Sequence, residues 1–245
     1  MAFGILVGYS SRMVVLAALA LSVGQCVVPR KSSDFVVVID AGHGGRDVGA
    51  PAVIPRRYEK QVTLAIATAL SKQLSRRKGL AVVMTRATDR NLTLVQRRQI
   101  IGSCSPNLVI SIHADSGPSS ARGPSVYVLN DAGEAVVVSR LMRSAQSAHH
   151  DDDTAYILAN LRQRGSMNFA IELAVRIRSA LGGADGKPRA IKTANFALLK
   201  APGVPSILVE TGYVTNRLDA EKLFNPNQQA TIASEIAASI VPIGR

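Results

Sequence analysis

The stretch that decides the fold is Phe35–Ala41, FVVVIDA, a continuous apolar run that ends at Gly42. A run of this kind is typical of a strand buried on both faces of a parallel sheet. Further along the chain, similar runs alternate with apolar residues at helical spacing. We predict further strands at 80–85, 108–112, 125–129, 196–199 and 206–209, and helices at 62–74, 93–101, 153–181, 218–223 and 228–240. The alternation predicts one layered α/β domain, with a mostly parallel, mixed central sheet of about six strands flanked by helices.

Residues 1–33 precede this domain and resemble an export signal followed by a linker. Arg12 supplies a positive charge and Met13–Leu21 is an uninterrupted apolar run. Ala18-Leu19-Ala20 and Ser22-Val23-Gly24 are two candidate cleavage sites. An uncleaved N-terminal anchor helix is the alternative, although the run is short for a membrane span. In either case we expect residues 34–245 to work outside the cytoplasm, in the periplasm or cell envelope.

Composition limits the classes of function. The hydrophobic fraction of 47% supports a buried core and argues against general disorder. The chain has 4% aromatic residues and no Trp, which argues against a module that stacks sugars on exposed rings. The net charge of +12 would attract polyanions such as nucleic acid, anionic lipid or an acidic wall polymer. No basic run is interleaved with aromatics, so we expect no nucleic-acid partner. Basic pairs such as Arg97-Arg98 are expected on solvated helix faces.

The two cysteines, Cys26 and Cys104, are too few for a disulfide framework. A single bridge between them cannot be inferred from sequence. We expect Cys104 to be a small buried residue.

Three polar residues stand where predicted strands end: His43 after the first, His113 after the third and Glu210 after the last. In open α/β sheets, functional groups gather beyond the carboxyl ends of the strands. Glu59 stands at the start of the helix that follows the His43 loop. Each residue also has an ordinary structural explanation, since a lone His is often only hydrogen-bonded, Glu59 could favour its helix end, and Glu210 could pair with a surface arginine.

Together the four residues suggest a catalytic metal site. Two histidines and one carboxylate form a common zinc set, which leaves a coordination position for water. His43, Glu59 and His113 are the candidate ligands. Glu210 is the candidate carboxylate that takes a proton from the water and delivers it to a leaving amine.

Four segments resemble the signature blocks of one family and occur in its order. They are Val38–Gly45 (VIDAGHGG), Tyr58-Glu59-Lys60, Ser111–Asp115 (SIHAD) and Val204–Tyr213 (VPSILVETGY). The family is the zinc-dependent N-acetylmuramoyl-L-alanine amidases of the bacterial cell wall, and the similarity extends from about Phe35 to Ile240.

The resemblance implies that His43, Glu59 and His113 bind Zn²⁺ and that Glu210 is the catalytic carboxylate. It also implies a peptidoglycan hydrolase that cleaves the amide between N-acetylmuramic acid and L-alanine of the stem peptide, in cell separation, wall recycling or lysis. The alternatives are a zinc peptidase acting within the stem peptide and a non-catalytic wall-binding regulator. We expect a monomer that contacts the membrane only through its export signal.

One segment departs from the family pattern. Some exported relatives carry, in the region equivalent to 130–154, an extra helix that covers the zinc until a protein activator removes it. Glu134, the only glutamate of this segment, cannot be aligned with a metal-blocking residue. Residues 130–154 therefore stay a candidate lid or regulatory insertion, and an activator protein stays a candidate partner.

Overall fold

A computed structural model describes residue 26, residues 34–182 and residues 191–241. Six strands in these ranges form one sheet, in the order β2-β1-β3-β6-β4-β5. The strands are β1 Phe35–Ala41, β2 Leu80–Met84, β3 Leu108–Asp115, β4 Ser125–Leu129, β5 Ile191–Ala194 and β6 Ser206–Tyr213. The helices are α1 Glu59–Leu74, α2 Leu94–Cys104, α3 Asp131–Ser147, α4 Asp152–Leu181, α5 Arg217–Leu223 and α6 Pro226–Ser239, with a short 3₁₀ helix η1 at Ala197–Lys200.

The sheet is mostly parallel, as the sequence predicts. Strands β2, β1, β3 and β6 run parallel to one another, whereas β4 pairs antiparallel with β6 and parallel with β5. The inner parallel strands β1, β3 and β6 are buried on both faces, which explains the continuous apolar runs in their sequences. Their carboxyl ends lie along one edge of the sheet.

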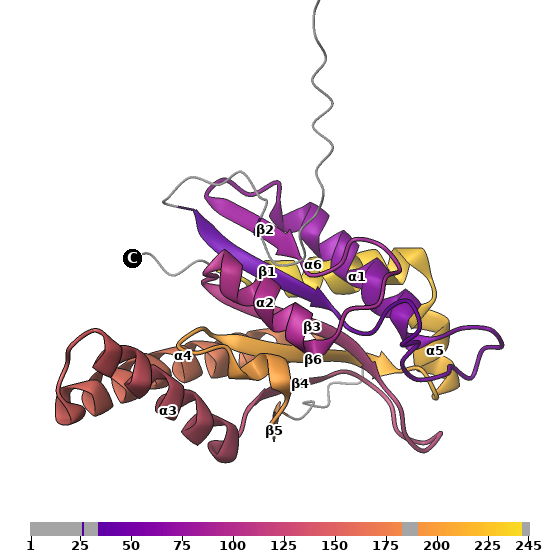
Figure 1. The fold of residues 1–245 in the computed structure, drawn as a ribbon. Helices are drawn as coiled ribbons and strands as arrows, with labels where there is room; N and C mark the ends of the chain where they lie inside the picture. The colour runs from indigo at the N-terminus through magenta and orange to yellow at the C-terminus, as the bar shows by residue number, and fades with distance from the viewer. Residues whose placement is uncertain (1–25, 27–33, 183–190, 242–245) are drawn as a thin grey trace, which may run out of the picture.

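Two layers of helices cover the sheet (Figure 1). On one face α1, the C-terminal part of α4, and α6 enclose the largest apolar cluster, which includes Ile39, Ile110 and Ile207 from three adjacent strands. On the other face α2 and η1 cover Val38 and Val109, and α3 packs with the N-terminal part of α4 over Leu208. Side chains alternate along a strand, so the residues two positions further on also project toward the second face. They are Asp40, Ser111 and Glu210.

Residues 130–154 fold as an ordered part of this second layer. Asn130 accepts a hydrogen bond from the backbone N–H of Gly133 at the start of α3. Asp151 accepts one from the N–H of Thr154 at the start of α4. The predicted helix over 153–181 is confirmed, since α4 runs from Asp152 to Leu181 and Gly182 follows as its C-cap.

One of the predicted strands is wrong. Residues 196–199 do not form a strand, because Phe196 precedes η1 and the other three lie within it. The sheet reaches six strands through β5, Ile191–Ala194, which was not predicted. β5 has four residues, includes the polar Lys192 and Thr193, and lies at the sheet edge, so it shows no apolar run. In the described ranges, no helix is long and apolar enough to cross a membrane.

Cys104 is buried at the end of α2, as expected, and it is also joined to Cys26 in a disulfide. The bond closes a sequence separation of 78 residues. Cys26 packs against the apolar cluster between α2 and η1. The bridge therefore fixes residue 26 to the second face of the sheet; the rest of the predicted signal and linker, 1–25 and 27–33, lies outside the described residues.

Candidate metal centre

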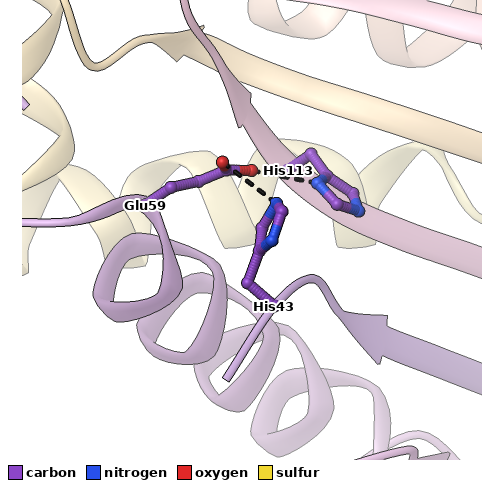
Figure 2. A group of neighbouring side chains, drawn as sticks. All are labelled: His43, Glu59 and His113. Atoms are coloured by element: carbon purple, nitrogen blue, oxygen red, sulfur yellow. Dashed lines mark hydrogen bonds and ion pairs between the residues drawn. The ribbon is translucent and has the colours of Figure 1, made fainter. Parts of the chain in front are cut away.

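Three of the four predicted site residues come together at the carboxyl edge of the sheet (Figure 2). His43 lies two residues beyond β1, His113 lies within β3, and Glu59 is the first residue of α1. One carboxylate oxygen of Glu59 lies 3.0 Å from Nε2 of His43, and the other lies 2.9 Å from Nδ1 of His113. The two imidazole rings are 5.0 Å apart, edge to face.

These side chains are held by neighbours on their outer sides. Nδ1 of His43 lies 2.8 Å from Asp47 Oδ1, which favours a proton on Nδ1 and directs Nε2 toward Glu59. Glu59 accepts hydrogen bonds from the backbone N–H groups of Ala50 and Ala114. Asp47 was not identified from sequence, and the signal that could have indicated it is a carboxylate four residues after a candidate ligand on the same loop.

Two glycines make the close approach of these side chains possible. A Cβ atom at position 42 would lie 2.4 Å from the His113 ring. At Gly49, whose φ is +67°, a Cβ would lie 2.6 Å from a Glu59 oxygen. Any larger residue at either position would push a candidate ligand aside.

Two buried arginines fix the loop that carries His43. Arg97, on α2, is 4% exposed, so the prediction that it lies on a solvated face is wrong. Its guanidinium forms a buried ion pair with Asp40 at 2.6 Å and donates to the carbonyls of Ala41 and His43 at 2.7 and 2.6 Å. Arg86 is fully buried and donates to the carbonyls of Ala41 and Gly42.

The electrostatics of the cluster follow from its contacts. Burial opposes the charge on His43, but its hydrogen bonds and charge interactions with Glu59 and Asp47 prevail and raise its pKa from 6.5 to about 9. Burial likewise opposes the charge on Glu59, and its bonds to His113 and His43 hold its pKa far below the usual range. Glu59 is therefore an anion at neutral pH, facing two imidazoles.

Glu210 lies on β6 directly opposite His113 in the register of the two strands. The alternation that places Leu208 on the second face also places Glu210 there. Burial is the main cause that raises the pKa of Glu210 from 4.5 to about 7, and the negative charges of Asp115 and Glu59 add to it. Its Oε2 atom is inaccessible to solvent and has no hydrogen-bond partner among the described residues.

A cavity of about 630 Å³ contains all four residues. Besides the polar cluster, its walls combine apolar residues with polar ones such as Asn91, Thr93 and Ser116, and the apolar part comes mainly from α2, η1 and the segments before them. Residues of 130–154 are absent from its lining in this structure. The apolar walls include Leu92, Leu94, Phe196, Leu198 and Leu199.

The donor set fits a divalent metal. His43, Glu59 and His113 each offer one ligand atom, and these atoms lie within 4.8 Å of one another. Imidazole and carboxylate donors suit zinc and related ions. A metal set of this kind, beside a buried carboxylate able to exchange a proton near neutral pH, defines the class of metal-dependent hydrolases.

Comparison with known proteins narrows this class. Residues 37–241 match the profile of the N-acetylmuramoyl-L-alanine amidase family. The chain is 32% identical over 219 residues to the amidase AmiC of Neisseria meningitidis serogroup B, which covers 84% of the chain and 51% of that protein. It is 28% identical over 220 residues to a putative amidase of Buchnera aphidicola, covering 84% of the chain and 92% of that protein. The chain thus spans about half of one relative and nearly all of another.

Solved structures agree with the sequence comparison. The amidase AmiC2 of Nostoc punctiforme is 31% identical, superposes with a TM-score of 0.62, and covers 84% of this chain and 94% of its own. An amidase of Clostridium difficile 630 is 26% identical with a TM-score of 0.66, covering 85% and 95%. The chain therefore belongs to the N-acetylmuramoyl-L-alanine amidase family.

Proposed function

We propose that this protein hydrolyses the amide that joins the lactyl group of N-acetylmuramic acid to L-alanine of the peptidoglycan stem peptide, using a zinc ion held by His43, Glu59 and His113. The observation that supports this most strongly is the placement of Glu210. A carboxylate with a pKa of about 7 and an unpartnered oxygen lies opposite a candidate ligand, in the same cavity as all three.

Each residue has a separate role in this proposal. A zinc ion, when bound, lowers the pKa of a coordinated water and polarises the scissile carbonyl. Asp47 orients His43, and Arg97 holds the carbonyl of the same residue. Glu210 accepts the proton that the attacking water loses and delivers it to the leaving nitrogen, so that one water and one amide give a carboxylic acid and an amine. The apolar walls reduce the access of other water to these charges.

Export is part of the proposal. The disulfide between Cys26 and Cys104 supports it, because such bonds persist in oxidising compartments outside the cytoplasm. The apolar run Met13–Leu21 supports it from the sequence. Sequencing the N-terminus of protein recovered from the cell envelope would test cleavage after Ala20.

The decisive experiment is a digest of purified sacculi, with and without a chelator, followed by mass analysis of the products. We expect intact stem peptides that begin with L-alanine, and no release once the metal is removed. A peptidase would instead leave L-alanine attached to muramic acid, and a wall-binding regulator would release nothing.

Glu210→Gln tests the assignment of the proton shuttle. Removing a general acid–base group lowers turnover about 10²–10⁴-fold, while the zinc content of the purified variant should stay at one ion per chain. Glu221→Gln is the matched control, because Glu221 only pairs with Arg217 at the surface. Unchanged turnover in Glu210→Gln would remove Glu210 from the mechanism.

A further inference from the structure

A second cavity, of about 390 Å³, lies beside the metal cavity along the seam between α2 and η1. Ala197 and Leu198 of η1 line both cavities. On α2, Leu94 and Arg97 border the metal cavity, whereas residues of the following turns, including Ile101, border the second one. The two cavities are therefore neighbours along one helix rather than separate surface features.

Three helices each contribute an arginine to this second cavity: Arg98 from α2, Arg140 from α3 and Arg162 from α4. Among the described residues, no carboxylate lines the cavity. Across the ranges that the structure describes, none of the three forms an ion pair with an acidic side chain. We call this cavity the arginine pocket.

Local contacts hold two of these arginines in place. Arg162 packs on Gly203, whose φ is +65°, and a Cβ atom there would lie 2.2 Å from Arg162 Nε. Nη1 of Arg140 lies 3.5 Å from the carbonyl oxygen of Lys200, while the ammonium of Lys200 donates toward the carbonyl of Asn195 at 3.4 Å. The remaining walls are mainly apolar: Ile101, Pro106, Leu198, Ala201, Pro202 and Val204.

Four cationic side chains, the three arginines and Lys200, gather at this pocket with no carboxylate among the described residues that line it, and this favours binding of an anion. Guanidinium groups match carboxylate and phosphate oxygens with paired hydrogen bonds, and such charge-assisted bonds are stronger than neutral ones. The arginine pocket thus suits an oxyanion carried on a partly apolar chain.

The position of the pocket indicates where that oxyanion comes from. In the proposed reaction the cleaved amide is at the N-terminus of the stem peptide. The rest of the peptide therefore extends away from the metal site and ends in a carboxylate. Helix α2 borders the metal cavity with its first residues and the second cavity with later ones. It has 11 residues and is about 16 Å long, and a peptide of four to five extended residues is about as long as the helix. We infer that the arginine pocket binds a carboxylate of the stem peptide, so that the seam between α2 and η1 is the track of the peptide. This inference rests on the proposed function.

The test compares two substrates and two proteins. The substrates are an N-acetylmuramoyl peptide of four to five residues with free carboxylates, and the same compound with its carboxylates converted to carboxamides. The proteins are the wild type and R98Q/R140Q/R162Q. We expect the wild type to prefer the acid through KM by about tenfold or more, with similar kcat, and the triple variant to lose this preference.

The control is a triple variant with the same change in net charge, in which exposed arginines outside the pocket are replaced: R76Q/R143Q/R164Q. It should keep the preference for the acid. If the preference came only from the net charge of the protein, both triple variants would lose it equally. Thermal unfolding of both variants checks that they are folded. Equal KM values for acid and carboxamide in the wild type would overturn the inference.

A binding measurement separates this inference from the proposed function. The free peptide acid and its carboxamide are titrated calorimetrically into the metal-free wild type. Tighter binding of the acid, lost only in R98Q/R140Q/R162Q, supports the pocket even if no hydrolysis were found. No difference between acid and carboxamide refutes the pocket even if the amidase is active. Binding to anionic phospholipid vesicles that depends on the three arginines, without peptide binding, would assign the pocket to lipid phosphate instead.

Discussion

Glu210 is held where its ionised form is disfavoured, and this has consequences for stability as well as for chemistry. Burial raises its pKa from 4.5 to about 7. The backbone register that pairs it with His113 leaves its Oε2 without a hydrogen-bond donor among the described residues. A group so placed can exchange a proton near neutral pH, but the folded protein is destabilised whenever that group is charged.

Glu210→Gln should therefore stabilise the metal-free protein at alkaline pH. Below pH 4.5 Glu210 is protonated in both states and the substitution should have little effect. As pH rises from 4.5 to about 7, the unfolded chain ionises first, so the wild type loses stability and levels off above 7. At pH 8.5 we expect a gain of roughly 2–3 kcal/mol in the variant.

Urea unfolding in the presence of a chelator, at pH 4 and pH 8.5, measures this gain. Glu221→Gln, at an exposed ion pair, should change stability little at either pH. A variant that is no more stable than the wild type at pH 8.5 would show that Glu210 is not destabilised by its surroundings.

At the scale of elements, α2 is tied to the metal centre through one side chain. Arg97 reaches from the first turn of the helix to the carbonyls of Ala41 and His43 and to the carboxylate of Asp40. Asp40 also accepts hydrogen bonds from Thr85 and Ser111, so β1, β2 and β3 are joined at the same point. The orientation of His43 thus depends on how α2 docks on the sheet.

Arg97→Lys should weaken metal binding without removing any ligand. Lysine retains one charge for Asp40 but cannot also reach the carbonyls that Arg97 holds with separate N–H groups. We expect zinc affinity to fall about 10–100-fold, as for other residues that orient ligands, and stability to fall by about 1–3 kcal/mol. Competition titration against a chromophoric chelator measures the affinity.

Arg76→Lys, on an exposed turn, is the matched control and should bind zinc as the wild type does. If Arg97→Lys bound zinc with unchanged affinity, the contact between α2 and the His43 loop would be a matter of stability alone.

The same elements show how far sequence reasoning reaches. The parallel strands were predicted because of their continuous apolar runs. His43, His113 and Glu210 were predicted because each follows such a run, and Glu59 because it begins the helix after the His43 loop. The sequence could not indicate that Arg97 is buried while Arg98 is exposed, since the partners of Arg97 are mainly backbone carbonyls that leave no pattern. β5 was missed because it gains its place by pairing with β4, not by its own hydrophobicity.

At the scale of the whole molecule, the disulfide joins Cys26 to the layer that borders both cavities. Cys104 ends the helix whose beginning carries Arg97, and Cys26 packs on the cluster that includes Leu198. Leu198 lines both the metal cavity and the arginine pocket. The bond therefore stabilises the docking of α2 and η1 from the outside.

Reduction of this bond should lower the stability of the whole domain. Opening a loop closed across 78 residues restores chain entropy to the unfolded state, and the expected loss is about 4.5 kcal/mol. Urea unfolding with and without a phosphine reductant measures it in the wild type. The double variant C26A/C104A should have the stability of the reduced protein and should not respond to reductant. If the wild type were equally insensitive, the bridge would not contribute to stability in solution.

Helix α2 is held both by Cys104 at its end and by Arg97 at its start. We therefore expect the reduced protein to lose zinc at a lower urea concentration than the one at which it unfolds. In the oxidised protein the two transitions should coincide.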